Sequence, residues 1–519
     1  MTKIDLLTIG FIQTTIGGGK SYNQLLAISQ SNKKQIIVVP SKELCDEHKR
    51  QLLAFNATLS IKVIHTDTSN SSTAATLVTE CVTTASQIII TTKETFERAL
   101  HRGLSNLHQY QLTIDEAINT HKAHYWKMFK SSYMHIKNYV DFVPVTSDHY
   151  VIQVKASLTK RQILQGIATN QTSHADVLLQ STEVRKFFDF VLSASHSTVI
   201  SKSIIDGFEG INTSLEKEST LFATVSLLDA QVFNKFRKIT ILSSRFTETE
   251  SYKALEAQGT KLVDLKPDAV MTNGRPNIYI HYAIDKNYTA AMRDNTETGK
   301  IWVNSVGKNI QQYFLEYAFS FIGDEEYIYC CNPEIDQHRF KGNGHMINTP
   351  HGLNGYQHIK YAIHVQSVLA NQDEINALNS ILGLTRADVD HERCVLNCTQ
   401  FCGRTAIRDA HNTDDVHLFV MDKRRADDLL KTYPSATVIK ADIPQIQALI
   451  DQNKTVRKQR SKKEGTIPKK ARDCKSNFEK DWQDPTKQPK ITKARINNYI
   501  DNMQQYYSNS ELIINICRN

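Results

Sequence analysis

The chain has 519 residues, 40% of them hydrophobic, which is enough for more than one domain with its own core. The net charge is +8, the nine cysteines have no dense regular spacing, and no run of about twenty apolar residues occurs. These features exclude a disulfide-rich secreted domain and a membrane-spanning protein. The first residues, MTKIDLL, lack a signal-peptide pattern, so we expect a cytoplasmic protein without membrane contact.

A glycine cluster follows the first apolar run. The stretch Lys3–Ile12 predicts a buried strand, Ser21–Ser29 predicts a helix, and TTIGGGKS connects them. This strand-loop-helix order is typical of a phosphate-binding loop, although Thr14 occupies its first glycine position and an ordinary flexible turn is the alternative. In such a loop the glycine N–H groups face the phosphates, the lysine contacts the β/γ-phosphates and the serine holds Mg²⁺. The ATP-binding residues would be Gly17, Gly18, Gly19, Lys20 and Ser21.

Two adjacent carboxylates follow another short apolar run, Leu112–Ile114. Asp115 and Glu116 come at its end, where ATP hydrolysis requires one acid for the metal and one base for water. We expect Asp115 to hold Mg²⁺ through water and Glu116 to polarise the attacking water. Such a pair is also common on solvated surfaces, so its weight depends on the upstream loop.

Taken in order, these segments resemble the motifs of superfamily 2 helicases of the DEAD/DEAH-like type. The resemblance spans roughly residues 4–430, includes phage- or plasmid-type replication helicases, and extends distantly to viral origin-binding helicases. It implies an α/β fold with two RecA-like domains and parallel sheets, an ATP and Mg²⁺ site between them, and nucleic acid as partner. Coupling and nucleic-acid-binding positions would be Ser41, Thr92, Ser243, Ser244, Thr349, Gly352 and Asn354.

A further segment, CTQFCGRTAIRD, matches the pattern Q-x-x-G-R of the last family motif. Gln400 and Arg404 occupy the matching positions, but the second arginine of the family falls where Ile407 stands, and Arg408 is one position late. On one α-helix a shift of one residue turns a side chain by about 100°, so the two arginines would face differently. We predict Arg404 as the arginine that neutralises the γ-phosphoryl charge, with Arg408 as the alternative.

An insertion is expected in the first domain. Glu116 and Ser244 are separated by 127 residues, more than a minimal core needs, which points to an insertion of roughly 119–233. Within it, His121–Val140 has four lysines, five aromatics and no acid. Tyr125, Phe129 and Tyr133 fall at helical spacing, which favours an amphipathic helix packed on the core. A surface on which nucleic-acid bases stack is the alternative.

The second domain should alternate strands and helices from about Pro276. Five strand candidates are KIWVNSV, EEYIYCC, GHMINTP, YAIHVQS and DVHLFVMD. Cys394, Cys398 and Cys402 fall on one helical face, and without a C-x-x-C pair or a nearby pair of histidines we expect buried packing rather than a metal site.

The C-terminal segment has its own composition. Residues 454–495 contain fifteen Lys or Arg and five Asp or Glu, a balance of +10 that exceeds the +8 of the whole chain. This predicts a basic arm, either merely solvated or in contact with phosphates. After it, 491–507 predicts a short helix with Tyr499 on its apolar face.

The expected organisation is therefore a RecA-like domain 1 over 1–256, a RecA-like domain 2 over 276–450 and a basic tail over 451–519. The expected function is an ATP-dependent helicase or translocase in replication or repair. DNA is favoured over RNA, replication proteins are possible partners, and a phage- or plasmid-encoded protein would act in the host cytoplasm. The alternative is an origin-binding initiator or remodelling switch that uses ATP with little unwinding.

Overall fold

The computed structural model describes residues 7–14, 16–68, 72–116, 118–128, 130–157, 182–193, 195–210, 220–266, 276–293, 307–333, 337–347, 355–409, 411–453, 478 and 499. Thr349, Gly352 and Asn354, the predicted strand 300–306 and nearly all of the basic tail lie outside these residues. The chain divides into two compact units, Met1–Ala290 with Phe314–Asp442, and Ala291–Tyr313 with Ile443–Asn519. The first unit holds all three sheets.

The first sheet is parallel throughout and has the strand order β12-β1-β11-β5-β2-β4-β3. Most positions of its inner strands are buried, as expected for strands with both faces covered. In parallel sheets all carboxyl ends lie at one edge, which brings the ends of β1, β5 and β11 together. The strands are β1 Thr8–Gln13, β2 Lys34–Val39, β3 Ile61–Ile64, β4 Ile88–Thr92, β5 Tyr110–Asp115, β11 Lys238–Ser243 and β12 Lys261–Asp264.

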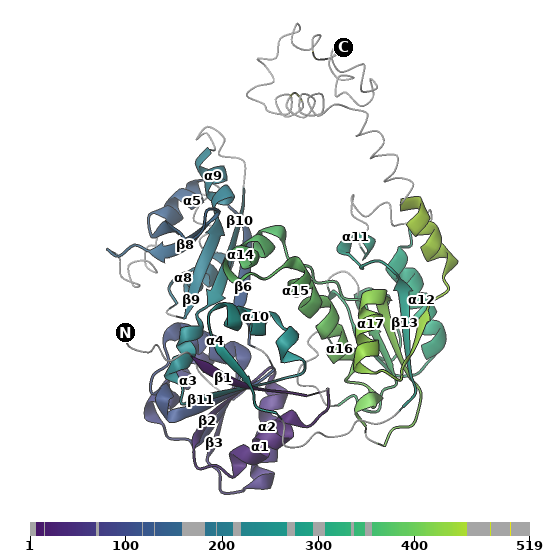
Figure 1. Cartoon of the computed structure of the whole chain (residues 1–519), viewed down its shortest axis with the longest axis horizontal. Helices are drawn as coiled ribbons and strands as arrows, with labels where there is room; N and C mark the ends of the chain where they lie inside the picture. The colour runs from purple at the N-terminus through teal and green to yellow at the C-terminus, as the bar shows by residue number, and fades with distance from the viewer. Residues whose placement is uncertain are drawn as a thin grey trace. The chain divides into compact units, whose positions relative to one another are not determined.

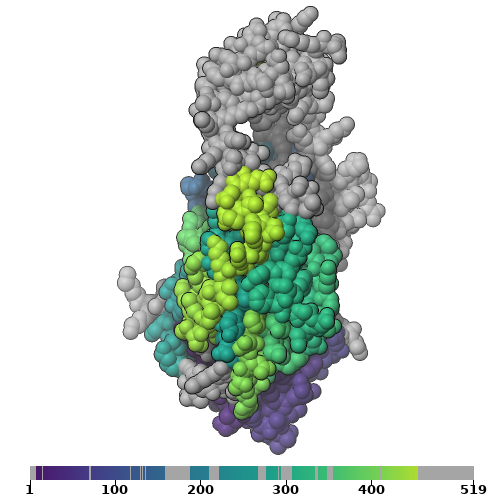
Figure 2. Space-filling view, turned by 90° about the vertical axis from the view of Figure 1, so that its right-hand side faces the viewer, coloured from purple at the N-terminus to yellow at the C-terminus, as the bar shows by residue number. Residues whose placement is uncertain are grey.

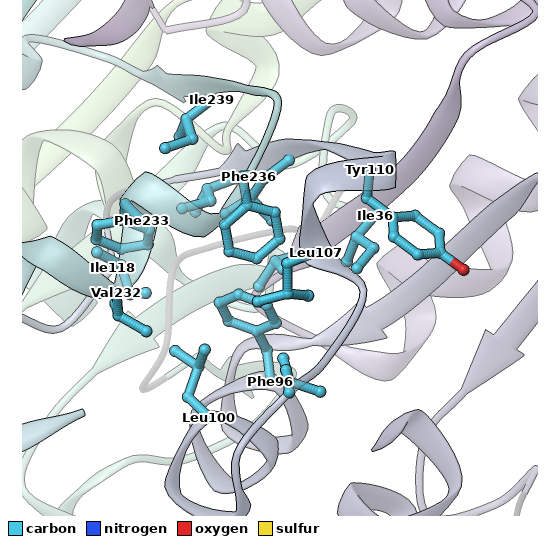
Figure 3. Close-up of a cluster of buried hydrophobic side chains, with 14 of the residues drawn as sticks. Ile36, Phe96, Leu100, Leu107, Tyr110, Ile118, Val232, Phe233, Phe236 and Ile239 are labelled. Carbon is cyan, nitrogen blue, oxygen red and sulfur yellow. The ribbon is translucent and has the colours of Figure 1, made fainter. Parts of the chain in front are cut away.

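Helices cover this sheet with apolar faces. Figure 3 shows Phe96 and Leu100 of α4 among the side chains of Leu107 and Phe236, and the rings of Phe96 and Phe236 lie 6.3 Å apart. Fully burying such a side chain stabilises the fold by about 1.5–3 kcal/mol. The helices are α1 Lys20–Ser29, α2 Lys42–Phe55, α3 Thr73–Thr83, α4 Lys93–Arg102 and α10 Glu250–Ala257.

An antiparallel sheet is inserted between β5 and β11 of the first sheet, with the order β6-β10-β9-β8-β7 (Figure 1). Its strands are β6 His121–Met128, β7 Val140–Pro144, β8 His149–Val154, β9 His196–Ser201 and β10 Thr220–Leu228. Its helices are α5 Lys130–Lys137, α8 Thr182–Val191 and α9 Lys202–Gly210.

The predicted amphipathic helix through Tyr125, Phe129 and Tyr133 is wrong as secondary structure. Residues 121–128 form strand β6, in which buried positions alternate, and the helix α5 starts only at Lys130. Trp126 is buried beside Phe222, with ring centroids 4.8 Å apart, and Tyr133 stacks on Phe208 at 4.7 Å. These two aromatic rings therefore pack in the core of the insertion and offer no surface to bases.

A second parallel sheet has the order β15-β14-β16-β17-β13-β18. Its strands are β13 Ile278–Ile284, β14 Tyr327–Cys330, β15 Gly344–Met346, β16 Tyr361–His364, β17 Val416–Asp422 and β18 Thr437–Lys440. Its neighbours along the chain include α12 Ile310–Ile322, α14 Gln372–Leu382, α15 Arg386–Asp390, α16 Asn397–Cys402 and α17 Lys423–Thr432. Residues of this part, green in Figure 2, cover much of the face seen there, above the purple N-terminal residues of the first part.

Four of the five predicted strands of the second sheet are present, and the fifth lies outside the described residues. Two strands were missed: β13, which is interior to the sheet, and the short β18. The presence of two parallel sheets with helices confirms the predicted α/β class with two RecA-like parts. As expected, Cys394, Cys398 and Cys402 are buried, and all seven cysteines of the described part are free and buried.

Helix α14 of the second part packs on the inserted sheet of the first. Its Leu378 is fully buried in a cluster with Val225 and Leu227 of β10 and Ala254 of α10. The insertion is thus in apolar contact with both RecA-like parts.

In the second unit, described residues include 291–293 of α11, which spans Ala290–Arg293, and a helix over 444–453. Asn309 donates to the Arg293 carbonyl, and Tyr499 of the predicted tail helix stacks on Phe478 with ring centroids 3.9 Å apart. Among the residues that the structure describes, no helix combines the length and apolar composition that crossing a bilayer requires.

Candidate active site

The glycine loop turns directly from β1 into α1. Gly17 has φ 81° and Gly19 has φ 77°, conformations that residues with a Cβ rarely adopt. Helix α1 begins at Lys20, and no side chain caps its first N–H groups. Uncapped N–H groups at a helix N-terminus favour an anion. The loop lines a cavity of about 330 Å³, a size typical of small-molecule sites.

The two predicted carboxylates reach this cavity from the end of β5. The Ser21 Oγ donates to Asp115 Oδ1 at 2.9 Å, and the Lys20 Nζ lies 4.0 Å from Glu116 Oε1. Glu116 has φ 70°, unusual for a residue other than glycine, and such strain is found preferentially at functional sites. The structure therefore brings together the loop and the carboxylate pair, which are separated by about ninety residues.

Asp115 is buried, and burial together with the neighbouring Glu116 raises its pKa, while His48, Lys20 and Ser21 oppose that shift. A divalent cation would favour the charged form of this carboxyl group. The Ser21 hydroxyl and the Asp115 carboxylate are oxygen donors of the kind that Mg²⁺ prefers. These two residues therefore fit the predicted Mg²⁺ site.

His48 was not predicted. Its Nε2 lies 3.4 Å from Asp115 Oδ2, and its Nδ1 is buried without a hydrogen-bond partner among the described residues. Burial lowers the pKa of His48 although Asp115 opposes the shift, so a neutral ring is favoured. A lone histidine on α2 gives no signal in the sequence, because only the fold turns that helix face towards β5.

Both arginines of the last motif line the same cavity, and the expected divergence of their side chains is wrong. The reason is that no α-helix connects them: α16 ends at Cys402, a turn follows, and residues 406–408 form a short 3₁₀ helix. Burial and the nearby Arg408 lower the pKa of Arg404 to about 10, while Glu116 and Asp115 oppose this shift. Two desolvated guanidinium groups in one cavity create a site for an anion.

Gly403 of the second part lies against Ile16 of the glycine loop in the first part. A Cβ built at this glycine would lie 2.7 Å from Ile16 Cγ2 of the glycine loop and 3.0 Å from the Tyr433 hydroxyl. A side chain at position 403 would therefore displace the loop or the second part.

The remaining predicted residues of the first part lie at the carboxyl edge of its sheet. Ser243 ends β11 and is buried, while the Oγ of Ser244 accepts from Gln400 Nε2 at 3.3 Å, which joins the first part to the second. Ser41 and Thr92 are the N-caps of α2 and α4, and their side chains accept from Leu44 N and Thr95 N. Their hydroxyl groups are therefore also used structurally.

The described site can hold a polyphosphate between opposed groups. Lys20 and the uncapped start of α1 belong to the first part, Arg404 and Arg408 belong to the second, and the carboxylate pair lies between them. The lining charges, which also include Glu47, are balanced without an anion. This arrangement suits phosphoryl transfer, in which catalysis depends mainly on positioning and charge neutralisation.

The structure is similar to solved helicase structures at low sequence identity. For an XPD helicase the identity is 13% and the TM-score 0.46, covering 84% of this chain and 96% of that one. For Xpd4 of S. tokodaii the values are 11% and 0.43, with 83% and 96% covered. For S. cerevisiae Dbp5 bound to RNA and ADP BeF3 they are 10% and 0.34, with 87% and 90% covered. No curated protein matches the sequence. Residues 5–169 match the family model described as DEAD/DEAH box helicase, a range that includes Lys20, Asp115 and Glu116.

Proposed function

We propose that this superfamily 2-type helicase enzyme, which carries a DEAD/DEAH box helicase domain, hydrolyses ATP between its two RecA-like parts to translocate on or unwind a strand of DNA in replication or repair. One observation carries the proposal: Lys20, the Asp115-Glu116 pair, Arg404 and Arg408 line a single cavity although they come from both parallel-sheet parts. Hydrolysis would then depend on how the two parts meet.

In this mechanism the residues act from three sides. The start of α1 and Lys20 hold the β/γ-phosphates, and Glu116 orients the attacking water and accepts its proton at a carboxylate oxygen. Arg404 neutralises the charge that develops on the transferred phosphoryl group. Mg²⁺ held by Ser21 and Asp115 would neutralise phosphate charge when it is bound.

The nucleic acid would contact the carboxyl edge of the first sheet. Ser41 and Thr92 lie next to each other along that edge, because they come at the ends of the neighbouring strands β2 and β4. Each residue also lies at a helix N-terminus, which favours phosphate. Thr349, Gly352 and Asn354 are proposed as the corresponding contacts of the second part. The buried free cysteines of the described residues support a reducing compartment, and we propose the cytoplasm.

The test measures ATP hydrolysis by the purified chain with single-stranded DNA, duplex DNA or RNA as activator. We expect single-stranded DNA to stimulate turnover most. Lys20→Ala should abolish turnover because the β/γ-phosphate charge is no longer neutralised, and Glu116→Gln should bind ATP but hydrolyse it slowly. Near-normal hydrolysis by the Lys20→Ala protein would refute the site.

A strand-displacement assay on a tailed duplex separates the two forms of the proposal. A motor displaces the strand with ATP and not without it. Hydrolysis with altered DNA affinity but without displacement would support the initiator or remodelling switch in place of the motor.

A further inference from the structure

The helical stretch that carries Gln400 lies beside a large cavity. It runs through the π-helical segment His391–Leu396 into α16 and ends just before Arg404. The cavity has a volume of about 830 Å³ and is lined by Ser243 and Gln400 as well as by Arg393. Because this side of the helical stretch faces the cavity, close packing cannot fix its position on that side. Its position must instead be fixed by side chains that reach across the cavity.

Arg393 spans the gap to three other elements. Its Nε lies 3.2 Å from Glu250 Oε1 on α10, and its Nη2 lies 2.6 Å from Glu374 Oε1 on α14 and 2.9 Å from His121 Nε2 on β6. Both carboxylates are almost fully buried. One guanidinium group thus connects the first part, the insertion and α14 to the stretch that precedes Gln400.

Glu374 is charged because of these contacts. Burial raises its pKa, but hydrogen bonds from His121 and Arg393 outweigh burial and hold the pKa at about 2. Glu374 also accepts from the Tyr125 hydroxyl at 3.0 Å. Removing Arg393 would leave the buried carboxylate of Glu374 without the counter-charge of this guanidinium group, which proteins tolerate poorly.

A second arginine holds the same stretch from another side. Arg245, directly after Ser244, donates to both carboxylate oxygens of Asp428, at 2.6 and 2.8 Å, and Thr399 donates to Asp428 at 2.7 Å. Glu248, His391 and Asp428 have ligand atoms within 4.8 Å of one another, as a metal site would. Arg245 donates to both of these carboxylates, so a guanidinium group supplies the cation of this cluster.

We propose that Arg393 is a positioning residue for ATP turnover, which fixes the stretch His391–Cys402 against the first part and the insertion so that Gln400 and Arg404 face the nucleotide. This inference rests on the proposed function. Arg393 precedes Gln400 by seven residues, or about 10 Å along a helix, and therefore acts through the helix and does not touch the nucleotide. Single π-helical turns such as His391–Leu396 are frequent at functional sites.

The experiment compares Arg393→Ala, Arg393→Lys and the double variant Arg393→Ala/Glu374→Gln with the unaltered chain. Arg386→Ala is the matched control, because Arg386 is an exposed arginine that donates to the Ala370 carbonyl and to Gln372 of the second part. The readouts are kcat, the affinity for a fluorescent ADP analogue and the midpoint of thermal unfolding.

We expect Arg393→Ala to lower kcat by about 10²-fold, the effect of a small misplacement of catalytic groups, with nucleotide affinity changed by less than about threefold. Arg393→Lys should also be slow, because an ammonium group cannot reproduce the planar fork. The double variant should recover thermal stability, since the uncompensated charge of Glu374 is gone, while kcat stays low.

Two results would overturn the inference. Recovery of kcat together with stability in the double variant would mean that Arg393 only balances buried charge. Full turnover by Arg393→Lys and Arg393→Ala would mean that the stretch needs no such contact. An unaltered chain that hydrolyses no ATP would instead refute the proposed function itself.

Discussion

At the scale of single residues, the arginine pair of the last motif illustrates what spacing in a sequence can and cannot decide. The pattern Q-x-x-G-R identified Gln400 and Arg404. Because Arg408 stands one position after the place of the second family arginine, we expected its side chain to face elsewhere. The helix ends at Cys402, so helical geometry does not apply to the two arginines, and both reach the cavity. The role of His48 beside Asp115 could not be predicted, because only the fold brings this residue of α2 to the end of β5.

We predict that Arg404→Ala lowers kcat by about 10³-fold or more, because a guanidinium group aimed at the transferring phosphoryl acts mainly in the transition state. Affinity for ATP should fall much less. Arg408→Ala, which removes a cation from the same cavity, is the matched control and should be milder. Steady-state hydrolysis and binding of a fluorescent nucleotide measure both effects. The reverse order of severity would assign the role to Arg408.

At the scale of elements, apolar runs located most strands, and failures occurred where local pattern was ambiguous. Residues 121–133 contain aromatic residues at helical spacing, yet the alternation of buried positions in His121–Met128 prevails because the neighbouring β10 offers a full antiparallel partner. Strand β13 was missed although it is interior to its sheet. Its sequence IYIHYAI mixes polar and aromatic residues, and only the sheet shows that His281 is buried.

The buried His281 on β13 makes the stability of the fold depend on pH. It donates to or accepts from Tyr317 and His417, at 2.9 and 3.1 Å, and its ring stacks near that of Phe419. Burial, reinforced by His417, lowers the pKa of His281 to about 4 from its usual 6.5. The unfolded chain therefore takes up the proton first, and the stability that the neutral ring provides is full above pH 6.5 and is lost as the pH falls towards 4.

We predict that up to roughly 3 kcal/mol of unfolding free energy is lost across this range through His281. Urea unfolding at a series of pH values from 7.5 downward should show a shallower loss for His281→Gln than for the unaltered chain. His108→Gln, at an exposed position, is the control and should leave the slope unchanged. Equal slopes for His281→Gln and the unaltered chain would exclude His281 as the cause.

At the scale of the whole molecule, charge is distributed unevenly along the chain, and this was evident from the sequence alone. The motifs proposed to bind and hydrolyse ATP precede Asp422, whereas the segment 454–495 carries a balance of +10. The large-scale feature that sequence did not reveal is the contact of the insertion with α14, because the residues that form it are distant along the chain and ordinarily apolar.

We predict that deletion from Lys454 onward leaves basal ATP hydrolysis intact and weakens binding to DNA. Each cationic contact with a phosphate changes the slope of log K against log salt by roughly −0.7 to −0.9, so loss of five contacts would flatten it by about four. Fluorescence anisotropy on one oligonucleotide across a salt series, with hydrolysis followed in parallel, gives both values. Equal slopes would mean that the segment is only solvated, and lost hydrolysis would mean that the core needs it.

The absence of a side chain at Gly403 leaves just enough room for the loop that carries Ile16. A single added methyl group at position 403 would already clash with the Ile16 side chain. The methyl group introduced by Gly403→Ala should slow hydrolysis, because it prevents the two parts from coming fully together. Trimming the opposite surface with Ile16→Ala in the same chain should restore part of the rate, which steady-state turnover of the single and double variants measures. A double variant as slow as Gly403→Ala would mean that the contact with Ile16 does not limit the approach of the two parts. If the rate returns, the absence of one methyl group at position 403 determines how closely the two parts can approach each other.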